Sequence, residues 1–275
     1  MTTPAEAARA FEAACRAELV ALKPGNVHVF AAGHGMEVAH FERAAAAAAP
    51  AIAAEGLRVG ARIEAAVKAS LAVAGCNTNL GIILLGAPLV AAALLPRPQG
   101  LRRRLSQVLE ALDVADAAGA FRAIAAASPG GLGSAADADV RHPATLSLSA
   151  AMALAADRDL IARQYGDGYA EVFTLGVPAL GADPTAPEGV EDAFLAFLST
   201  LPDSHIARKF GREAAEGVRA EAQAVRAFLA GGSGAARRAA LAAFDASLKA
   251  RGLNPGTSAD LTVASILAAL LEQGG

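Results

Sequence analysis

The chain has 275 residues, of which 54 % are hydrophobic and 19 % charged, and its net charge is −3. This balance provides no broad basic surface, which argues against nucleic acid as the main partner. Two cysteines cannot form a disulfide framework, so a reducing, cytoplasmic setting is expected, and the N-terminal residues are not expected to act as a signal peptide.

Alanine accounts for most of the hydrophobic excess, and aromatic residues make up only 4 % of the chain. Because alanine has the best intrinsic helix propensity, the sequence predicts an all-α fold, with residues 1–275 as one multi-helix bundle domain. Residues 145–166 form either one helix or two, and residues 169–181 mix glycine and proline. In chain order, helices are predicted near residues 4–22, 37–50, 57–73, 80–95, 101–112, 116–127, 145–166, 188–198, 206–229, 235–249 and 258–271.

No charged residue lies between Ala69 and Pro96, so this stretch must be tested as a membrane span. A transmembrane helix needs about 20 predominantly apolar residues. The polar residues 77–79 interrupt the run near its start, and the remainder contains Gly81 and Pro88. A buried core helix is therefore predicted, with a membrane span as the alternative.

Polar residues that interrupt apolar helices need a reason, because burying an unpaired polar group costs about 1–3 kcal/mol. The first such segment ends the first helix, where Lys23 is followed by Gly25 and Asn26. A lysine beside exposed backbone amides suits an anion such as phosphate. The alternative is that K-P-G is only a helix stop.

The second polar segment is Asn77-Thr78-Asn79, which introduces the apolar helix after Gly75. Amide protons at a helix start, supported by the helix dipole, favour an anion. Thr78 or Asn79 can also act simply as the N-cap of that helix.

Two further segments lie in the middle of the chain. Residues 130–141 combine glycines, which can cradle phosphate, with the charged Asp139 and Arg141; an ordinary surface loop is the alternative. In the predicted helix 145–166, Asp157 and Asp159 lie about 200° apart around the helix axis, so one is expected in the site and the other in a structural role.

The last two polar segments each precede a late helix. Residues 203–209 contain Asp203 and several basic side chains, and residues 254–260 end at Asp260. Helix capping explains either segment alone. Asp260 is expected in the first helical turn, exposed to solvent or directed at a cation. The histidines and cysteines do not have the spacing of zinc ligands.

The order of these segments resembles the triphosphoribosyl-dephospho-CoA synthase family. That family has a P-K-P-G segment, a G-x-N-T-x-x-G segment, a glycine-rich G-x-x-G segment, an Asp-containing segment and a P-G-x-S-A-D-L segment. The counterparts here are residues 23–25, 75–81, 130–133, 203–205 and 255–261. The match extends over nearly the whole chain.

The resemblance implies an all-helical enzyme that transfers the triphosphoribosyl part of ATP to the ribose hydroxyl of dephospho-CoA and releases adenine, with the site at helix ends and inter-helix loops. Such a reaction needs triphosphate binding, with Mg²⁺, and a base. The candidate bases are Glu18, His28 and Asp139, and the candidate Mg²⁺ ligands are Asp157, Asp203 and Asp260. The expected substrate- and phosphate-binding residues are Lys23, Gly25, Asn26, Asn77, Thr78, Asn79, Arg141, Arg158, His205, Arg208, Lys209 and Ser258.

One segment departs from the family pattern. The best-known members read N-T-H-K-G where this chain has Asn77-Thr78-Asn79-Leu80-Gly81, so a basic pair is replaced. One alternative is therefore a divergent member that acts on another phosphorylated substrate in cofactor biosynthesis, such as a one-carbon carrier pathway. A second alternative is a non-catalytic helical binding module. Small-molecule nucleotides are the expected partners, and a homodimer is one open alternative for the oligomeric state.

Overall fold

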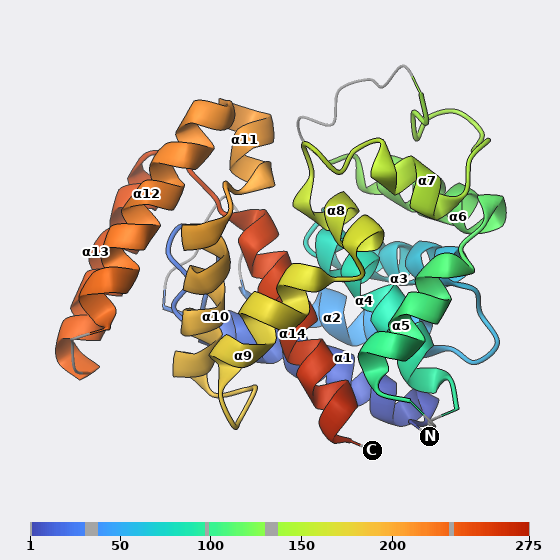
Figure 1. The fold of residues 1–275 in the computed structure, drawn as a ribbon, viewed down its shortest axis with the longest axis horizontal. Helices are drawn as coiled ribbons and strands as arrows, with labels where there is room; N and C mark the ends of the chain where they lie inside the picture. Colours follow the sequence, from blue (N-terminus) through green and yellow to red (C-terminus); the bar gives the residue numbers. More distant parts are fainter. Residues whose placement is uncertain (1, 31–37, 97–98, 130–136, 231–233, 275) are drawn as a thin grey trace.

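The computed structural model describes residues 2–30, 38–96, 99–129, 137–230 and 234–274, and within these ranges the only regular elements are helices. Figure 1 shows their arrangement, which confirms the predicted all-α class. The elements are α1 (Pro4–Val20), α2 (Val38–Ala53), α3 (Val59–Ala74), α4 (Leu80–Leu94), α5 (Leu101–Glu110), α6 (Val114–Ala127), α7 (Leu148–Ala153), α8 (Leu160–Asp167), η1 (Val172–Gly176), α9 (Val177–Leu180), α10 (Pro187–Thr200), α11 (Ser204–Phe210), α12 (Arg212–Leu229), α13 (Gly234–Ala250) and α14 (Gly256–Gln273).

Local signals determine where several helices begin and end. Thr3 caps α1 in a capping box with Glu6, since each side chain accepts a hydrogen bond from the other residue's backbone N–H. Gly75 ends α3 in the left-handed region, at φ +69°. The predicted start of α1 and the predicted end of α3 are therefore confirmed.

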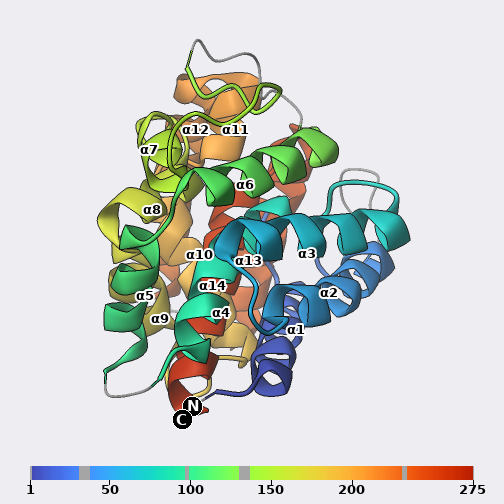
Figure 2. The same ribbon diagram turned by 90° about the vertical axis from the view of Figure 1, so that its right-hand side faces the viewer.

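Helix α14 forms the centre of the core, although it is the last element in the chain. It packs against α1, α4 and α10, which Figures 1 and 2 show around it. Its side chains Leu261, Ile266 and Leu267 are fully buried. A helix that is apolar on most of its surface is stable only when other helices cover it.

The charge-free stretch folds as α4, a helix of 15 residues whose side chains are mostly buried. None of the helices in the described ranges has the length and apolar character that a membrane span requires. The prediction of a buried core helix is confirmed.

One helix prediction differs from the structure: the stretch 206–229 is not one helix, because Gly211 at φ +92° separates α11 from α12. Of the two alternatives for residues 145–166, the structure has two helices, α7 and α8. In the stretch 169–181, which mixes glycine and proline, residues 172–180 form η1 and α9. Gly176 lets this segment pack tightly on α14, since a Cβ there would lie 2.0 Å from the Ser265 Oγ.

The α3–α6 contact gives a first prediction. The two helices cross so closely that a Cβ added to Gly119 would lie 2.5 Å from the Gly60 carbonyl oxygen. We expect Gly119→Ala to lower the free energy of unfolding by about 1–3 kcal/mol, because backbone atoms cannot rotate away as a side chain can. Urea denaturation followed by circular dichroism measures this change.

Gly217 in α12 is the matched control, because a Cβ there meets nothing within 4 Å. Gly217→Ala is expected to leave stability unchanged or raise it by up to about 1 kcal/mol, as alanine is the better helix former. Equal destabilisation by both variants contradicts the close-contact explanation.

Candidate active site

A cavity of about 910 Å³ lies where four helices begin: α4, α8, α11 and α14. Side chains from α6 and α7 complete its wall. This volume is in the range of small-molecule and cofactor sites in proteins. The amide ends of helices carry partial positive charge, and the first amides of α8 and α11 are already capped by the carboxylates of Asp159 and Asp203.

Hydrogen bonds at Asp203 and Ser204 hold three of these helix starts together. The Asp203 carboxylate caps α11 by accepting from the backbone N–H groups of His205 (2.9 Å) and Ile206 (3.1 Å). Its other oxygen accepts from Ser258 in α14, both from the N–H (2.8 Å) and from the hydroxyl (2.9 Å).

Ser204 makes the second set of links. Its hydroxyl oxygen accepts from the Leu160 N–H at the start of α8 (3.2 Å) and lies 2.9 Å from the Thr257 hydroxyl in α14. The starts of α8, α11 and α14 are therefore held in fixed positions relative to one another.

Asp260 lies in the cavity wall, where the first turn of α14 meets the first turn of α4. A Cβ on Gly81 would lie 2.1 Å from the Asp260 Oδ2, so only glycine fits against this carboxylate. Burial raises the pKa of Asp260 well above its usual range, and the nearby carboxylates of Glu18, Asp203 and Asp159 add to the effect. These neighbouring carboxylates therefore favour the protonated form of Asp260 in the absence of a cation.

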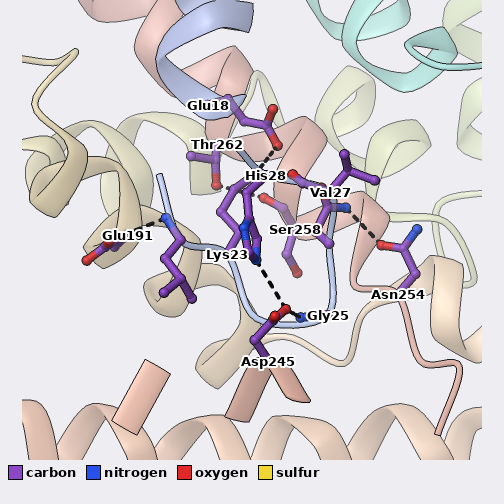
Figure 3. A network of polar contacts seen from close by, with 12 residues as sticks. Glu18, Lys23, Gly25, Val27, His28, Glu191, Asp245, Asn254, Ser258 and Thr262 are labelled. Carbon is purple, nitrogen blue, oxygen red and sulfur yellow. Dashed lines mark hydrogen bonds and ion pairs between the residues drawn. The ribbon is translucent and has the colours of Figure 1, made fainter. Parts of the chain in front are cut away.

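Lys23 and Glu18 form a buried ion pair beside the cavity (Figure 3). The Lys23 Nζ lies 3.0 Å from the Glu18 Oε1 and donates a 2.7 Å hydrogen bond to the Val27 carbonyl oxygen. Glu18 lines the cavity, whereas Lys23 is fully buried and does not. The prediction that Lys23 binds phosphate directly is corrected, because its ammonium group faces a carboxylate inside the protein.

The segment after Lys23 contacts the cavity on one side and α13 on the other. Asn26 lines the cavity and donates a 2.8 Å hydrogen bond to the Asn254 Oδ1. Gly25 lies on the other side, where its N–H donates to the Asp245 Oδ1 (2.8 Å) in α13. His28, which is 1 % exposed, has its Nε2 3.3 Å from the same carboxylate. Gly25 and His28 therefore anchor this segment to α13, and His28 is not placed to act as a base in the cavity.

In the Asn77-Thr78-Asn79 motif, too, some side chains line the cavity and one packs against a neighbouring helix. Asn77 and Thr78 line the cavity. In the part of the chain that the structure describes, the buried Thr78 Oγ1 has no hydrogen-bond partner, so it is available to a ligand. Asn79 is buried against α3, where it accepts a 2.6 Å hydrogen bond from the Ser70 hydroxyl. The prediction that Asn79 contacts substrate is corrected, because Asn79 does not line the cavity.

The segment before α8 contributes two carboxylates instead of one. Asp157 and Asp159 both line the cavity, because the chain leaves the helix before these residues and the expected 200° separation does not apply. Asp159 also caps α8 by accepting from the Ile161 N–H (2.8 Å) and the Ala162 N–H (3.2 Å). Its Oδ2 lies 3.6 Å from an Arg208 nitrogen.

Cationic side chains gather on the α8, α11 and α12 side of the cavity, where Arg158, Arg208 and Lys209 were expected. Arg163 and Arg212 also line it, and neither was predicted. Arg163 lies one helical turn after Asp159, and that spacing was the available signal. Arg212 lies near the site only because Gly211 turns the chain.

The structure therefore separates the predicted site residues into two sets. The cavity is lined by Glu18, Asn26, Asn77, Thr78, Asp139, Asp157, Arg158, His205, Arg208, Lys209 and Asp260. The residues behind its wall or away from it are Lys23, Gly25, His28, Asn79, Arg141, Asp203 and Ser258; of these, Arg141 is held by an ion pair with Asp139. The predicted glycine-rich loop at 130–133 lies outside the described residues.

The expected metal ligands are only partly brought together. Within the described ranges, no group of three or more His, Cys, Asp or Glu side chains is arranged to hold a metal ion. Asp203 is corrected as a ligand, because it is fully buried and already accepts four hydrogen bonds. Asp157 and Asp260 remain on the cavity wall.

An all-helical scaffold, a cavity of nucleotide size and opposed cationic and acidic side chains define an enzyme that handles a phosphorylated small molecule. The sequence matches the family model described as CitG, ATP:dephospho-CoA triphosphoribosyl transferase, over residues 4–275. The chain belongs to this family, whose reaction is the transfer of a triphosphoribosyl group from ATP to dephospho-CoA.

A solved structure agrees with this assignment. The fold is similar to a crystal structure from Archaeoglobus fulgidus that is provisionally described as a triphosphoribosyl-dephospho-CoA synthase. The TM-score is 0.66 at 26 % sequence identity, and the match covers 83 % of this chain and 97 % of that one. A search of curated proteins gives no match.

The role of Asp203 gives a second prediction. Asp203→Ala is expected to lower the free energy of unfolding by about 3 kcal/mol, because it removes a helix cap and leaves buried donors of α11 and α14 unpaired. Chemical denaturation measures the loss. Asp183→Ala is the control, because Asp183 also accepts a backbone hydrogen bond, from Thr185, but in an exposed turn. A stable but inactive Asp203→Ala protein contradicts the structural role.

Proposed function

We propose that the cavity binds ATP with its triphosphate at the cationic side and its adenine at the apolar side, and that transfer to dephospho-CoA releases adenine. The observation that carries this proposal is the convergence of four helix starts, basic side chains and two buried carboxylates on one cavity. A non-catalytic module whose polar motifs are only solvent-facing caps does not account for that convergence.

Arg158, Arg208, Lys209 and Arg212 line the side of the cavity formed by α8, α11 and α12. A triphosphate carries several negative charges, and basic side chains together with helix amides bind it through charge-assisted hydrogen bonds. Arg208 is also the positive group that partly offsets the charge around Asp260. The triphosphate is therefore expected between α11 and the start of α8.

The opposite side of the cavity is apolar. Phe121 and Ile124 come from α6, and Leu148 and Met152 from α7. Figure 1 shows α6 and α7 on one side of α8 and α11 on the other. A purine base stacks favourably on apolar and aromatic side chains, so this side suits adenine.

The reaction replaces the bond between adenine and the anomeric carbon of ATP with a bond to the acceptor hydroxyl. The hydroxyl gives its proton to a carboxylate, its oxygen attacks the anomeric carbon, and adenine leaves with the bonding electron pair and takes up a proton from water. Glu18 is the proposed base, because it lies in the wall beside Asp260 and is buried where a carboxylate can accept a proton.

The carboxylates of the cavity fit Mg²⁺. This ion is usually held by one or two carboxylates and by substrate phosphates, so a complete protein-only ligand set is not required. Asp157 and Asp260 would hold it, because both line the cavity, and a bound cation would favour the ionised form of Asp260, whose pKa is raised by burial and by nearby carboxylates. When bound, Mg²⁺ supplies neutralisation of the triphosphate charge.

A direct assay tests the function. We expect the purified protein to release adenine, detected by chromatography, when it is incubated with ATP, Mg²⁺ and dephospho-CoA. Omission of dephospho-CoA is the control and should abolish release. If adenine is released only with a different phosphorylated acceptor, dephospho-CoA is not the acceptor. That outcome favours the alternative of a divergent family member, which rests on Asn79-Leu80 in place of the family's basic pair.

Substitution of Asp260 tests the site. Asp260→Asn is expected to lower kcat by about 100-fold or more while the protein stays folded, because the amide has nearly the same size as the carboxyl group and adds no charge near Glu18 and Asp159. Steady-state kinetics and a thermal melt measure the two effects. Asp183→Asn, at an exposed turn, should leave both unchanged. Near-normal turnover of Asp260→Asn excludes this carboxylate from the reaction.

A further inference from the structure

The Lys23–Glu18 pair is unusual because only one of its partners faces the cavity. Lys23 is fully buried, and its ammonium group lies 3.0 Å from the Glu18 carboxylate and donates a 2.7 Å hydrogen bond to the Val27 carbonyl oxygen. Glu18 is 5 % exposed and lines the cavity. Figure 3 marks the ion pair between the Lys23 and Glu18 side chains with a dashed line.

A buried ammonium group has a high cost in free energy unless a charged partner offsets it. Here burial lowers the pKa of Lys23, and the carboxylate of Glu18 opposes that shift. A side chain that served only to stop a helix or fill the core could be apolar at this position. The ammonium group therefore points to a role for its charge.

Two neighbouring helices fix the segment that carries Lys23. From α10, the Glu191 carboxylate accepts a 3.3 Å hydrogen bond from the Leu22 N–H. From α13, Asp245 accepts from the Gly25 N–H at 2.8 Å. Gly25 fits because its φ of +79° and the Leu253 carbonyl oxygen, 2.7 Å from an added Cβ, exclude a side chain. The position of the Lys23 ammonium is thus set independently of any ligand.

We propose that Lys23 is a positioning residue that holds the Glu18 carboxylate ionised and directed into the cavity, without contacting substrate itself. The proposal rests on the proposed function, in which Glu18 accepts the proton of the acceptor hydroxyl. An ionised, oriented carboxylate is the form of Glu18 that can accept this proton.

The charged surroundings of Glu18 are consistent with this role. Burial raises the pKa of Glu18, and the positive charge of Lys23 opposes that rise, while Asp260 of α14 is a negative group nearby. Behind Lys23, the α13 side chains Asp245 and Lys249 are paired with each other at 3.1 Å. Without Lys23, the carboxylates of Glu18 and Asp260 would lie near each other with no buried countercharge, and Glu18 would favour its protonated form.

A double-mutant cycle on kcat tests the proposal. Glu18→Gln is expected to lower kcat by about 10²- to 10⁴-fold, and Lys23→Met by at least about tenfold with the KM for ATP unchanged. Because Lys23 acts through Glu18, the double variant should be no slower than Glu18→Gln alone. The proposal is overturned if the kcat losses of the two single variants multiply in the double variant, or if Lys23→Met raises the KM for ATP. Either result favours a direct contact between Lys23 and substrate.

Stability distinguishes a lost role from a lost fold. Lys23→Met leaves the buried Glu18 carboxyl group without its charged partner and is expected to lower the melting temperature, whereas the double variant removes both groups and should recover it. Recovery of the melting temperature together with recovery of kcat contradicts a positioning role. Lys68→Met is the matched control, because it removes a lysine from an ion pair with Glu64 outside the cavity; its kcat should be unchanged.

A measurement that does not depend on catalysis tests this proposal separately from the proposed function. The ¹³C chemical shift of the Glu18 side-chain carboxyl, assigned with Glu18→Gln, is expected to report an ionised group at neutral pH in the unsubstituted protein and a protonated group in Lys23→Met. An unchanged shift in Lys23→Met overturns the proposal. If no acceptor leads to release of adenine from ATP, the proposed function is overturned. The chemical shift of the Glu18 carboxyl group still tests the role of Lys23 in that case.

Discussion

The carboxylate of Asp203 is the interaction on which the rest of the site depends. One oxygen caps α11, and the other accepts from the backbone and the hydroxyl of Ser258 in α14. Through the adjacent Ser204, the same junction holds the start of α8. The cavity has a definite shape because three helix starts are joined at one buried point.

This junction also explains how an apolar protein can contain so many polar groups in one place. Asp203 is compensated by four hydrogen bonds, and Glu18 by Lys23. The Asp260 carboxylate lies against Gly81, and burial together with nearby carboxylates raises its pKa. The structure therefore compensates the supporting charges internally, whereas a bound cation would favour the ionised form of Asp260.

The sequence predicted the helices best where the signal is local. The capping box at Thr3 and the left-handed Gly75 depend only on neighbouring residues. The break at Gly211 and the packing of Gly176 on Ser265 depend on tertiary contacts, so periodicity did not reveal them. For the site, the motifs showed which segments meet, because polar residues in apolar helices need partners. They did not show which side chain of a motif faces the cavity: Lys23 and Asn79 lie behind the wall, Asn26 and Asn77 on it.

The central position of α14 has a consequence for how the protein is made. The core helix contacts α1, α4 and α10, yet among the described elements it follows all of them in the chain. Until residues 256–273 have been synthesised, the apolar faces of those earlier helices lack the helix that covers them. Long-range closure of this kind slows folding and exposes hydrophobic surface in the meantime. Removal of α14 would therefore take away both the centre of the core and Asp260.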